Sequence, residues 1–217
     1  MRVEENNILG SIRKAIFDYD KVGLIELVKQ SIEKNVDPLN VFKEMTEAIR
    51  EVGNLFNSGE LFLPDLIGAS DTMQSALPLL EEEMNKKGVA RKAEGVVVIG
   101  TVYGDVHSIG KNMVAALLRS EGFKVGDLGV NVSADSFMDA IKIEKADILA
   151  MSALLTTTMR EQEKIIFMLK QQKLRDKVKV MVGGAPITEL FAKEIGADGY
   201  APSAPEAVKL AKQLISK

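Results

Sequence analysis

The sequence predicts an α/β protein in which an N-terminal four-helix bundle cap precedes a flavodoxin- or Rossmann-like domain with a five-stranded parallel sheet. Up to about position 90, apolar residues recur only at helical spacing. From there to the end, β-branched runs alternate with helical stretches, which is typical of a parallel sheet with helices on both faces. We therefore predict two domains, a helical cap over residues 1–90 and an α/β ligand-binding domain over residues 91–217.

Composition and charge are those of an ordinary globular protein. Of the 217 residues, 46% are apolar and 27% are charged, and the net charge of −3 provides no general attraction for nucleic acid. The most hydrophobic run, residues 96–102, is too short to cross a bilayer, and the first residues lack the apolar core of a signal peptide. We therefore expect a cytoplasmic protein with no nucleic-acid or membrane partner.

The helices expected in the first domain follow one another at short intervals. Two apolar stripes begin at Ile8 and Leu24, and Asp37-Pro38 supplies the N-cap carboxylate and first-turn proline with which a third helix starts. A break at residues 57–60 precedes a fourth apolar stripe. Four helices with short connections indicate an antiparallel bundle.

Large apolar side chains gather around this break, where a solvated loop is expected: Leu55, Phe56, Leu61, Phe62 and Leu63. Such a patch needs a partner surface outside the bundle, either a flat apolar ligand face or a neighbouring domain. The charged segment 81–92, with a turn at Gly88, is the expected linker to the second domain.

The second domain is predicted to alternate strands with helices. The strands are expected at residues 95–102, 123–128, 146–152, 178–182 and 199–201, and the helices at 111–119, 133–144, 158–174, 189–195 and 205–215. We predict the strand order 2-1-3-4-5, which places a ligand at the carboxyl ends of the strands, beside strand one.

Small, hydroxylic and charged residues follow the predicted strands at these carboxyl ends. They are residues 104–110 after the first strand, Ser152 and residues 156–158 after the third, Gly183-Gly184 after the fourth, and residues 200–204 after the fifth. Small residues leave room for a ligand, and hydroxyl groups can satisfy its polar atoms. The sequence therefore predicts a ligand site at this edge of the sheet.

His107 is the only histidine of the chain, which has no cysteine. This composition excludes disulfides, thiol nucleophiles, iron–sulfur clusters, cysteine-ligated zinc and any site that needs two imidazoles. A lone histidine in a loop is most often a surface or capping residue. Asp105, however, can accept the N–H of one ring nitrogen and leave the other to a metal. We therefore predict that His107 is a metal ligand.

The motifs around His107 disfavour three other kinds of site. A serine hydrolase would need a G-x-S-x-G elbow, and a phosphate site would need a glycine-rich or Walker pattern. A response regulator would need an acidic pair after the first strand and a partner lysine late in the chain. The sequence contains none of these patterns.

Three motifs stand together at the predicted carboxyl edge: Asp105-x-His107-x-x-Gly110, Ser152-x-Leu154 and Gly183-Gly184. In combination they resemble the cobalamin-binding signature of methionine synthase and of the corrinoid proteins of methylamine and methanol methyltransferase systems. The helical half is similar to the cap domain of the same family at Leu55-Phe56, Gly59 and Phe62-Leu63-Pro64. The resemblance covers nearly the whole chain, and Tyr103 and Ser108 depart from the family pattern.

The resemblance implies a cofactor, cobalamin or a related corrinoid, bound by residues 91–217. His107 would be the lower axial ligand of its cobalt in the base-off/His-on mode, and Asp105 and Thr158 would continue a hydrogen-bonded chain from His107. Phe56 and Leu63 would cover the upper face of cobalt. The other residues expected to contact the cofactor are Gly104, Val106, Ser108, Ile109, Gly110, Ser152, Leu154, Thr156, Gly183, Gly184, Tyr200 and Ala204.

The function implied by the resemblance is that of a methyl carrier in one-carbon metabolism, such as methanogenesis or acetogenesis. The protein would take a methyl group from a substrate-specific methyltransferase and deliver it to a second methyltransferase acting on a thiol or pterin acceptor. A corrinoid reactivation protein would be a third partner, and alone the carrier would catalyse no reaction. A cobalamin-sensing regulator is the alternative. The small subunit of a B12-dependent mutase and a plain flavodoxin-like binding protein are less favoured, and a complete methionine synthase would be longer.

Overall fold

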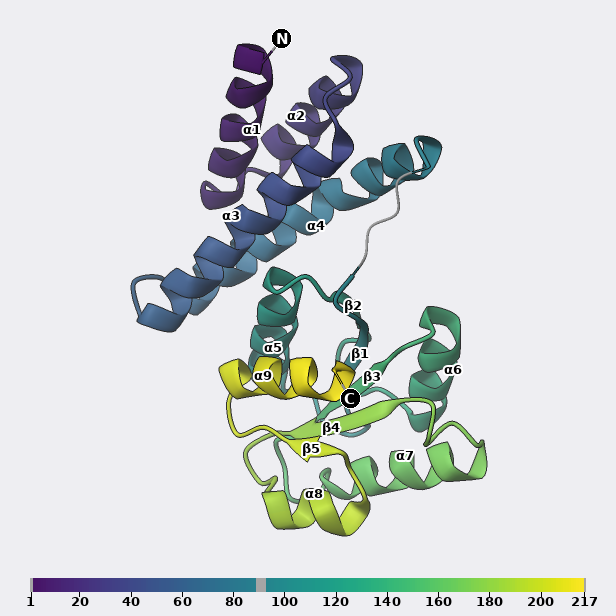
Figure 1. Cartoon of the computed structure of the whole chain (residues 1–217). Helices are drawn as coiled ribbons and strands as arrows, with labels where there is room; N and C mark the ends of the chain where they lie inside the picture. The colour runs from purple at the N-terminus through teal and green to yellow at the C-terminus, as the bar shows by residue number, and fades with distance from the viewer. Residues whose placement is uncertain (1, 89–92, 217) are drawn as a thin grey trace. The chain divides into compact units, whose positions relative to one another are not determined.

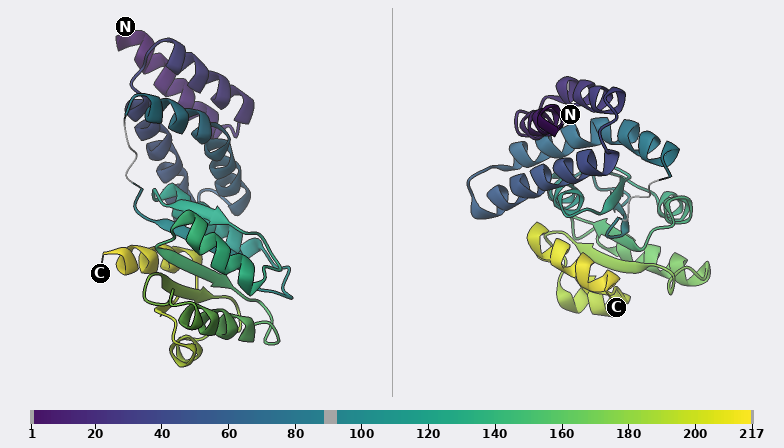
Figure 2. Two further views of the ribbon diagram at one scale, coloured as in Figure 1. Left: turned by 90° about the vertical axis from the view of Figure 1, so that its right-hand side faces the viewer. Right: turned by 45° about the horizontal axis from the view of Figure 1, so that its top comes forward.

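The computed structural model of the chain describes residues 2–88 and 93–216. The chain divides into two compact units, residues 1–92 and residues 93–217. One unit is made of helices, and in the other helices surround a sheet (Figures 1 and 2). Within the described residues, no helix has both the length and the apolar content needed to cross a membrane.

The first unit contains the predicted four helices, which are α1 (Arg2–Phe17), α2 (Lys21–Glu33), α3 (Pro38–Ser58) and α4 (Leu63–Lys86). Both α1 and α4 pack against α2 and α3. α3 begins where the side chain of Asp37 accepts a hydrogen bond from the N–H of Leu39 at 2.9 Å. It ends at Gly59, whose φ of 82° closes the helix in the left-handed conformation. The buried core includes Ile12, Ile16, Leu24, Met45, Ile49, Leu66 and Leu80.

The last helix of this unit overlaps the expected linker, although its apolar stripe, which reaches Met84, already predicts an end close to the observed one. α4 continues to Lys86, because Glu82 with Lys86 and Glu83 with Lys87 form ion pairs one helical turn apart, at 2.8 and 3.2 Å. The charged residues expected to open the linker are therefore the last turns of a helix, and the chain turns at Gly88 with a φ of 67°. The rest of the expected linker, up to position 92, lies outside the described residues.

The second unit contains a five-stranded parallel sheet with the predicted order β2-β1-β3-β4-β5. The strands are β1 (Val96–Thr101), β2 (Lys124–Asp127), β3 (Ile148–Ser152), β4 (Lys179–Gly183) and β5 (Gly199–Tyr200). Thr101 of β1 pairs with Ser152 of β3, and Ser152 pairs with Gly183 of β4. Because these strands end level with one another, the loops that follow them share one edge of the sheet.

Helices cover both faces of this sheet. They are α5 (Ile109–Ser120), α6 (Ala134–Glu144), α7 (Arg160–Gln171), α8 (Glu189–Ile195) and α9 (Ala204–Ile215). α5 and α9 pack together on one face, and α6, α7 and α8 lie on the other (Figure 1). α5 begins two residues earlier than predicted, at Ile109, and α7 begins two residues later, at Arg160, so Thr158 lies in the turn before α7.

Candidate functional site

The loop between β1 and α5 holds His107 beside Asp105. Nδ1 of His107 lies 2.8 Å from Oδ1 of Asp105. An ionised carboxylate can only accept hydrogen bonds, so in the neutral imidazole Nδ1 carries the proton and Nε2 keeps a free electron pair. Asp105 is fully buried, whereas the side chain of His107 is 48% exposed. The imidazole is therefore held by a buried group while remaining accessible itself.

The second carboxylate oxygen of Asp105 binds the loop after β3. Oδ2 accepts hydrogen bonds from the N–H of Leu154 and from the hydroxyl of Thr158, both at 2.7 Å. Burial by itself would raise the pKa of Asp105, but these bonds and those from His107 outweigh it and hold the pKa well below its ordinary value. The structure thus joins Thr158, Asp105 and His107 into one hydrogen-bonded chain with an anionic centre.

Thr101 holds the main chain of the same loop. Its side chain is buried at the end of β1, and its hydroxyl donates to the carbonyl oxygen of His107 at 2.9 Å. The N–H of His107 donates to Oδ1 of Asp105 at 3.1 Å. The backbone that carries the imidazole is thus bonded on both sides before any ligand binds. A lone hydroxyl residue within the apolar run of residues 96–102 is the signal in the sequence that could have identified Thr101.

Large apolar side chains lie exposed in the two loops that meet at Asp105. Tyr103, Val106 and Ile109 of the first loop are 59%, 69% and 70% exposed, and Leu154 and Leu155 of the second are each 41% exposed. Gathered apolar side chains of this kind mark a surface for a ligand or a partner. Leu155 is absent from the sequence-based prediction, although it adjoins the predicted contact residue Leu154.

Small residues occupy the ends of β3 and β4. A Cβ atom on Gly184, which has a φ of 125°, would lie 1.7 Å from the carbonyl oxygen of Ala153. Only glycine allows the two strand ends to approach this closely. Gly184 is half-buried together with Ser152 and Gly183, so this part of the edge stays partly open.

The other predicted contact residues of this unit lie in different surroundings. Thr156 is exposed in the loop after β3, and Ser108 is the N-cap residue of α5, between exposed residues of the His107 loop. Gly110 is also exposed, in the first turn of α5. Tyr200 packs against the hydrophobic core beneath α6–α8, and Ala204 is buried at the start of α9. The structure therefore places the side chains of these last two residues against the core.

In the helical unit, Phe56 and Leu63 are half-buried at the connection between α3 and α4, where Phe62 is 70% exposed. Oδ2 of Asp65 accepts from the N–H of Phe62 at 2.7 Å, and Oδ1 accepts from the hydroxyl of Tyr19 at 2.9 Å. Burial, together with this bond, raises the pKa of Tyr19 to about 12. The exposed Phe62 ring is therefore presented by an anchored turn.

Two buried polar side chains near the carboxyl edge of the sheet are missing from the sequence-based prediction. Nε2 of Gln162, in α7, donates to the carbonyl oxygens of Met151 and Gly183 at 3.1 and 3.3 Å, which joins the ends of β3 and β4. Nζ of Lys111, in α5, lies 2.5 Å from Oδ2 of Asp127 at the end of β2. Gln162 and Lys111 are buried at positions where a helical stripe would otherwise have an apolar residue. This polar interruption is the signal in the sequence.

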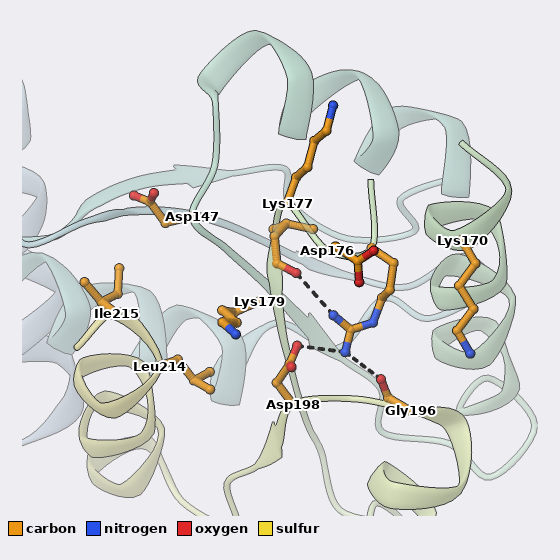
Figure 3. A pocket seen from close by; sticks show the side chains of 11 residues that line it. Asp147, Lys170, Asp176, Lys177, Lys179, Gly196, Asp198, Leu214 and Ile215 are labelled. Carbon is orange, nitrogen blue, oxygen red and sulfur yellow. Dashed lines mark hydrogen bonds and ion pairs between the residues drawn. The ribbon is translucent and has the colours of Figure 1, made fainter. Parts of the chain in front are cut away.

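A cavity of about 610 Å³ lies at the opposite, amino edge of the sheet (Figure 3). Its lining includes Asp147, Lys179 and Asp198, which stand where β3, β4 and β5 begin. The guanidinium of Arg175 donates to the carbonyl oxygen of Gly196 at 2.8 Å and lies 2.9 Å from Asp198. These bonds hold strand ends together, at the edge away from His107.

Comparison with known proteins links both units to B12 binding. Residues 95–209 match a family described as B12 binding domain, and residues 8–81 match a second family with the same description. The chain is 41% identical over 213 residues to the trimethylamine corrinoid protein of Methanosarcina barkeri, covering 98% of each chain. It is 42% identical over 212 residues to dimethylamine corrinoid protein 2 of Methanosarcina acetivorans, covering 97% of each. The chain belongs to the corrinoid protein family.

A solved structure supports the same assignment. The methanol:cobalamin methyltransferase complex of Methanosarcina barkeri contains a chain that is 32% identical, with a TM-score of 0.84, and the match covers 97% of this chain and 80% of that one. The predicted family, the predicted fold class and the predicted cofactor class, a corrinoid, are therefore confirmed.

The carboxyl edge of this corrinoid protein fits such a cofactor. A corrin ring brings four equatorial nitrogens to its cobalt, so the protein needs to supply a single axial nitrogen. Nε2 of His107 is a donor with a free electron pair, and the exposed side chains of Val106 and Ile109 beside it offer an apolar surface to a flat macrocycle. The donor set and its surroundings thus agree with the cofactor class.

Proposed function

We propose that this corrinoid protein carries a methyl group between two methyltransferases, with His107 as the lower axial ligand of cobalt. The observation that carries the proposal is the 2.8 Å contact between Nδ1 of His107 and Oδ1 of Asp105, which leaves Nε2 as the donor. When bound, the corrinoid supplies a cobalt centre that accepts and gives up a methyl group.

Asp105 fixes the tautomer and the direction of the imidazole. Its carboxylate stays ionised because the N–H of Leu154 and the hydroxyl of Thr158 hold its pKa low. A carboxylate that accepts the far N–H of a histidine orients the ring and strengthens its other nitrogen as a ligand. In this proposal Asp105 and Thr158 act through His107 and touch no substrate.

We further propose that residues 1–90 act as a cap and residues 91–217 as the corrinoid-binding domain. The match of residues 8–81 to a B12-binding family and the exposed ring of Phe62 support this division. In the proposed cap, Phe56, Phe62 and Leu63 would shield the reactive face of the cofactor from water until a partner replaces them.

The proposed partners are a methyltransferase that takes a methyl group from a methylated amine and a second one that acts on a thiol or pterin acceptor. Relatives that are 41% and 42% identical over nearly their full length are a trimethylamine and a dimethylamine corrinoid protein, which supports an amine as donor. The methanol:cobalamin methyltransferase complex supports direct association with the first partner. A corrinoid reactivation protein completes the proposed set.

The axial role of His107 is tested by loading the full chain with hydroxocobalamin and recording the electron paramagnetic resonance spectrum after one-electron reduction. The protein should carry a purification tag without histidine, because His107 is then its only imidazole. We expect each cobalt hyperfine line to be split into a triplet by ¹⁴N, and into a doublet when histidine alone is labelled with ¹⁵N. His107→Ala should abolish the part of the splitting that depends on the histidine isotope. Splitting in the wild type that does not change with the histidine isotope would refute the proposal, because the nitrogen would then belong to the cofactor's own benzimidazole.

The methyl-carrier role is tested with partner enzymes. The loaded and reduced protein is mixed with a methyltransferase specific for trimethylamine, dimethylamine, monomethylamine or methanol, each together with its methylated substrate, and methylation is followed by its absorbance change. We expect methylation with at least one of the amine enzymes. A protein that binds cobalamin through His107 but accepts a methyl group from none of them would contradict the carrier role and favour a sensor.

A further inference from the structure

Asn131 makes two hydrogen bonds to the His107 loop from outside it. It lies in the connection between β2 and α6. Its side-chain Oδ1 accepts from the N–H of Gly104 at 2.8 Å, and its own N–H donates to the carbonyl oxygen of Asp105 at 2.8 Å. One residue therefore holds two consecutive residues of the loop, Gly104 and Asp105, the second of which lies two positions before His107.

The backbone conformations on both sides suit this contact. Asn131 has a φ of 55° and Gly104 a φ of 79°, so both lie in the left-handed region that asparagine and glycine tolerate. The next residue, Val132, forms an isolated parallel bridge with Val102, and its N–H donates to the carbonyl oxygen of Thr101 at 3.0 Å. This bridge extends the pairing beyond β1 and β2 and places Asn131 against Gly104.

We propose that Asn131 is a positioning residue for His107, and that its side chain sets the backbone from which Asp105 orients the imidazole. Asp105 is held at its carboxylate by Leu154 and Thr158, and at its carbonyl oxygen by Asn131. Without the Oδ1 contact, the N–H of Gly104 loses its acceptor and the peptide between Tyr103 and Gly104 can rotate. The main chain that leads into Asp105 then shifts, and the carboxylate loses its alignment with Nδ1. The inference rests on the proposed role of His107 as the cobalt ligand.

Two substitutions separate a positioning residue from a turn residue. Asn131→Gly keeps the left-handed conformation and the backbone N–H, but it removes the oxygen that accepts from Gly104. Asn131→Asp keeps an oxygen at the same place. If Asn131 served only to turn the chain, Asn131→Gly would be as good as the wild type. If it positions His107, the imidazole is misaligned in Asn131→Gly, whereas Asn131→Asp keeps the alignment of the wild type.

The first readout is the tautomer of the single imidazole in the corrinoid-free protein. Long-range ¹H–¹⁵N correlation spectra of histidine-labelled protein, recorded at mildly alkaline pH, report which ring nitrogen carries the proton. We expect the Nδ1–H tautomer in the wild type and in Asn131→Asp. In Asn131→Gly the ratio of this tautomer to the other should fall by up to about fivefold, since one neutral hydrogen bond is lost.

A matched control and a second variant protect the interpretation. Asn35 in the helical unit also has a positive φ, of 54°, so Asn35→Gly makes the same chemical change in the unit that does not contain the loop and should leave the tautomer ratio unchanged. If Asn131→Gly does not fold, Asn131→Ser replaces it. The serine oxygen lies one bond nearer the main chain than Oδ1 of asparagine, so the same decrease in the tautomer ratio is expected. An unchanged tautomer ratio in the folded variant would overturn the inference.

The second readout distinguishes this inference from the role proposed for His107. In hydroxocobalamin-loaded protein, Asn131→Gly should lower the fraction of cobalt that shows imidazole splitting, and Asn131→Asp should restore it. If the wild-type splitting does not depend on the histidine isotope, the ligand role fails, whatever the tautomer shows. If His107→Ala abolishes the splitting but Asn131→Gly alters neither the tautomer ratio nor the splitting, the positioning role alone fails.

Discussion

At the amino edge of the sheet, Asp147 accepts a hydrogen bond from the N–H of Val96 at 2.8 Å, and Asp198 accepts one from the N–H of Val180 at 2.7 Å. Both line an open cavity and join neighbouring strands. At the carboxyl edge, Asp105 is fully buried. Its carboxylate accepts hydrogen bonds from His107 in its own loop and from Leu154 and Thr158 in the loop after β3. The difference lies in solvation: a carboxylate at an open edge keeps its water, whereas a buried one depends on the donors around it.

The orientation of a buried carboxylate is also fixed more strictly by its hydrogen bonds than that of a solvated one. Water can replace a lost partner of Asp147, but each donor to Asp105 is needed to offset its desolvation. The carboxyl edge therefore holds its one accessible imidazole in a single orientation. Aspartates near strand ends thus align strands at the amino edge and orient a ligand-binding side chain at the carboxyl edge, and three single variants compare the two edges.

The largest loss of stability is expected for Asp127→Ala at the carboxyl edge. The ammonium of Lys111 is 2% exposed and lies 2.5 Å from the carboxylate of Asp127, so the variant leaves a buried charge without its counterion. The free energy of unfolding should fall by about 3–5 kcal/mol, measured by urea denaturation. The double variant Lys111→Met/Asp127→Leu should recover most of this loss. A small loss in the single variant would show that the edge is more open to water than the structure indicates.

Asp105→Asn should destabilise less but damage the site more. Its amide oxygen can still accept from Leu154 and Thr158, while its NH₂ group then faces Nδ1 of His107. The imidazole must switch tautomer to accept from this group, which places the proton on Nε2. We expect a stability loss of about 2 kcal/mol and at least about tenfold weaker hydroxocobalamin binding. A variant that still shows imidazole splitting of the cobalt signal would contradict this reasoning.

The two forms of residue 105 should also differ in acid stability. The folded-state pKa of Asp105 lies below its ordinary value of 3.8, so the unfolded chain binds a proton more readily than the native one. Its contribution to stability is complete above that value and is lost as the pH falls through 3.8 toward the lower folded pKa. Urea midpoints measured from about pH 6 down to about pH 3 should fall more steeply in the wild type than in Asp105→Asn. Parallel curves would show that Asp105 is not held ionised by the fold.

The smallest effect is expected for Asp198→Ala at the amino edge. The variant loses the bond from the N–H of Val180 and the ion pair with Arg175, which keeps its bonds to the carbonyl oxygens of Val178 and Gly196. Because the edge is open to water, we expect a loss of about 1 kcal/mol in the free energy of unfolding. Hydroxocobalamin affinity should equal that of the wild type. Weaker binding would mean that the two edges are coupled through the sheet.

Most of the fold could be predicted from the sequence because its signals are local. The change from helical spacing to alternating β-branched runs near position 90 separated bundle from sheet, and five alternations were enough for the strand order. Asp37-Pro38 marked the start of α3 correctly. The apolar stripe of α4, which reaches Met84, came within two residues of the observed end at Lys86. The linker was expected to begin too early, at residue 81, because a charged run reads as a linker unless its ion pairs one turn apart are counted.

For the candidate site, the sequence by itself determined which groups are available: one imidazole, no thiol, and a carboxylate two residues before the histidine. Only the tertiary structure decided which nitrogen of His107 is free, because that depends on donors from the loop after β3 meeting Asp105. It also decided that Thr101 and Asn131 hold the loop. These contacts join residues far apart in the chain, or separated by a turn whose geometry the sheet imposes. A local pattern can mark Thr101 as an unusual hydroxyl residue, but it cannot specify the partners of Thr101 or Asn131.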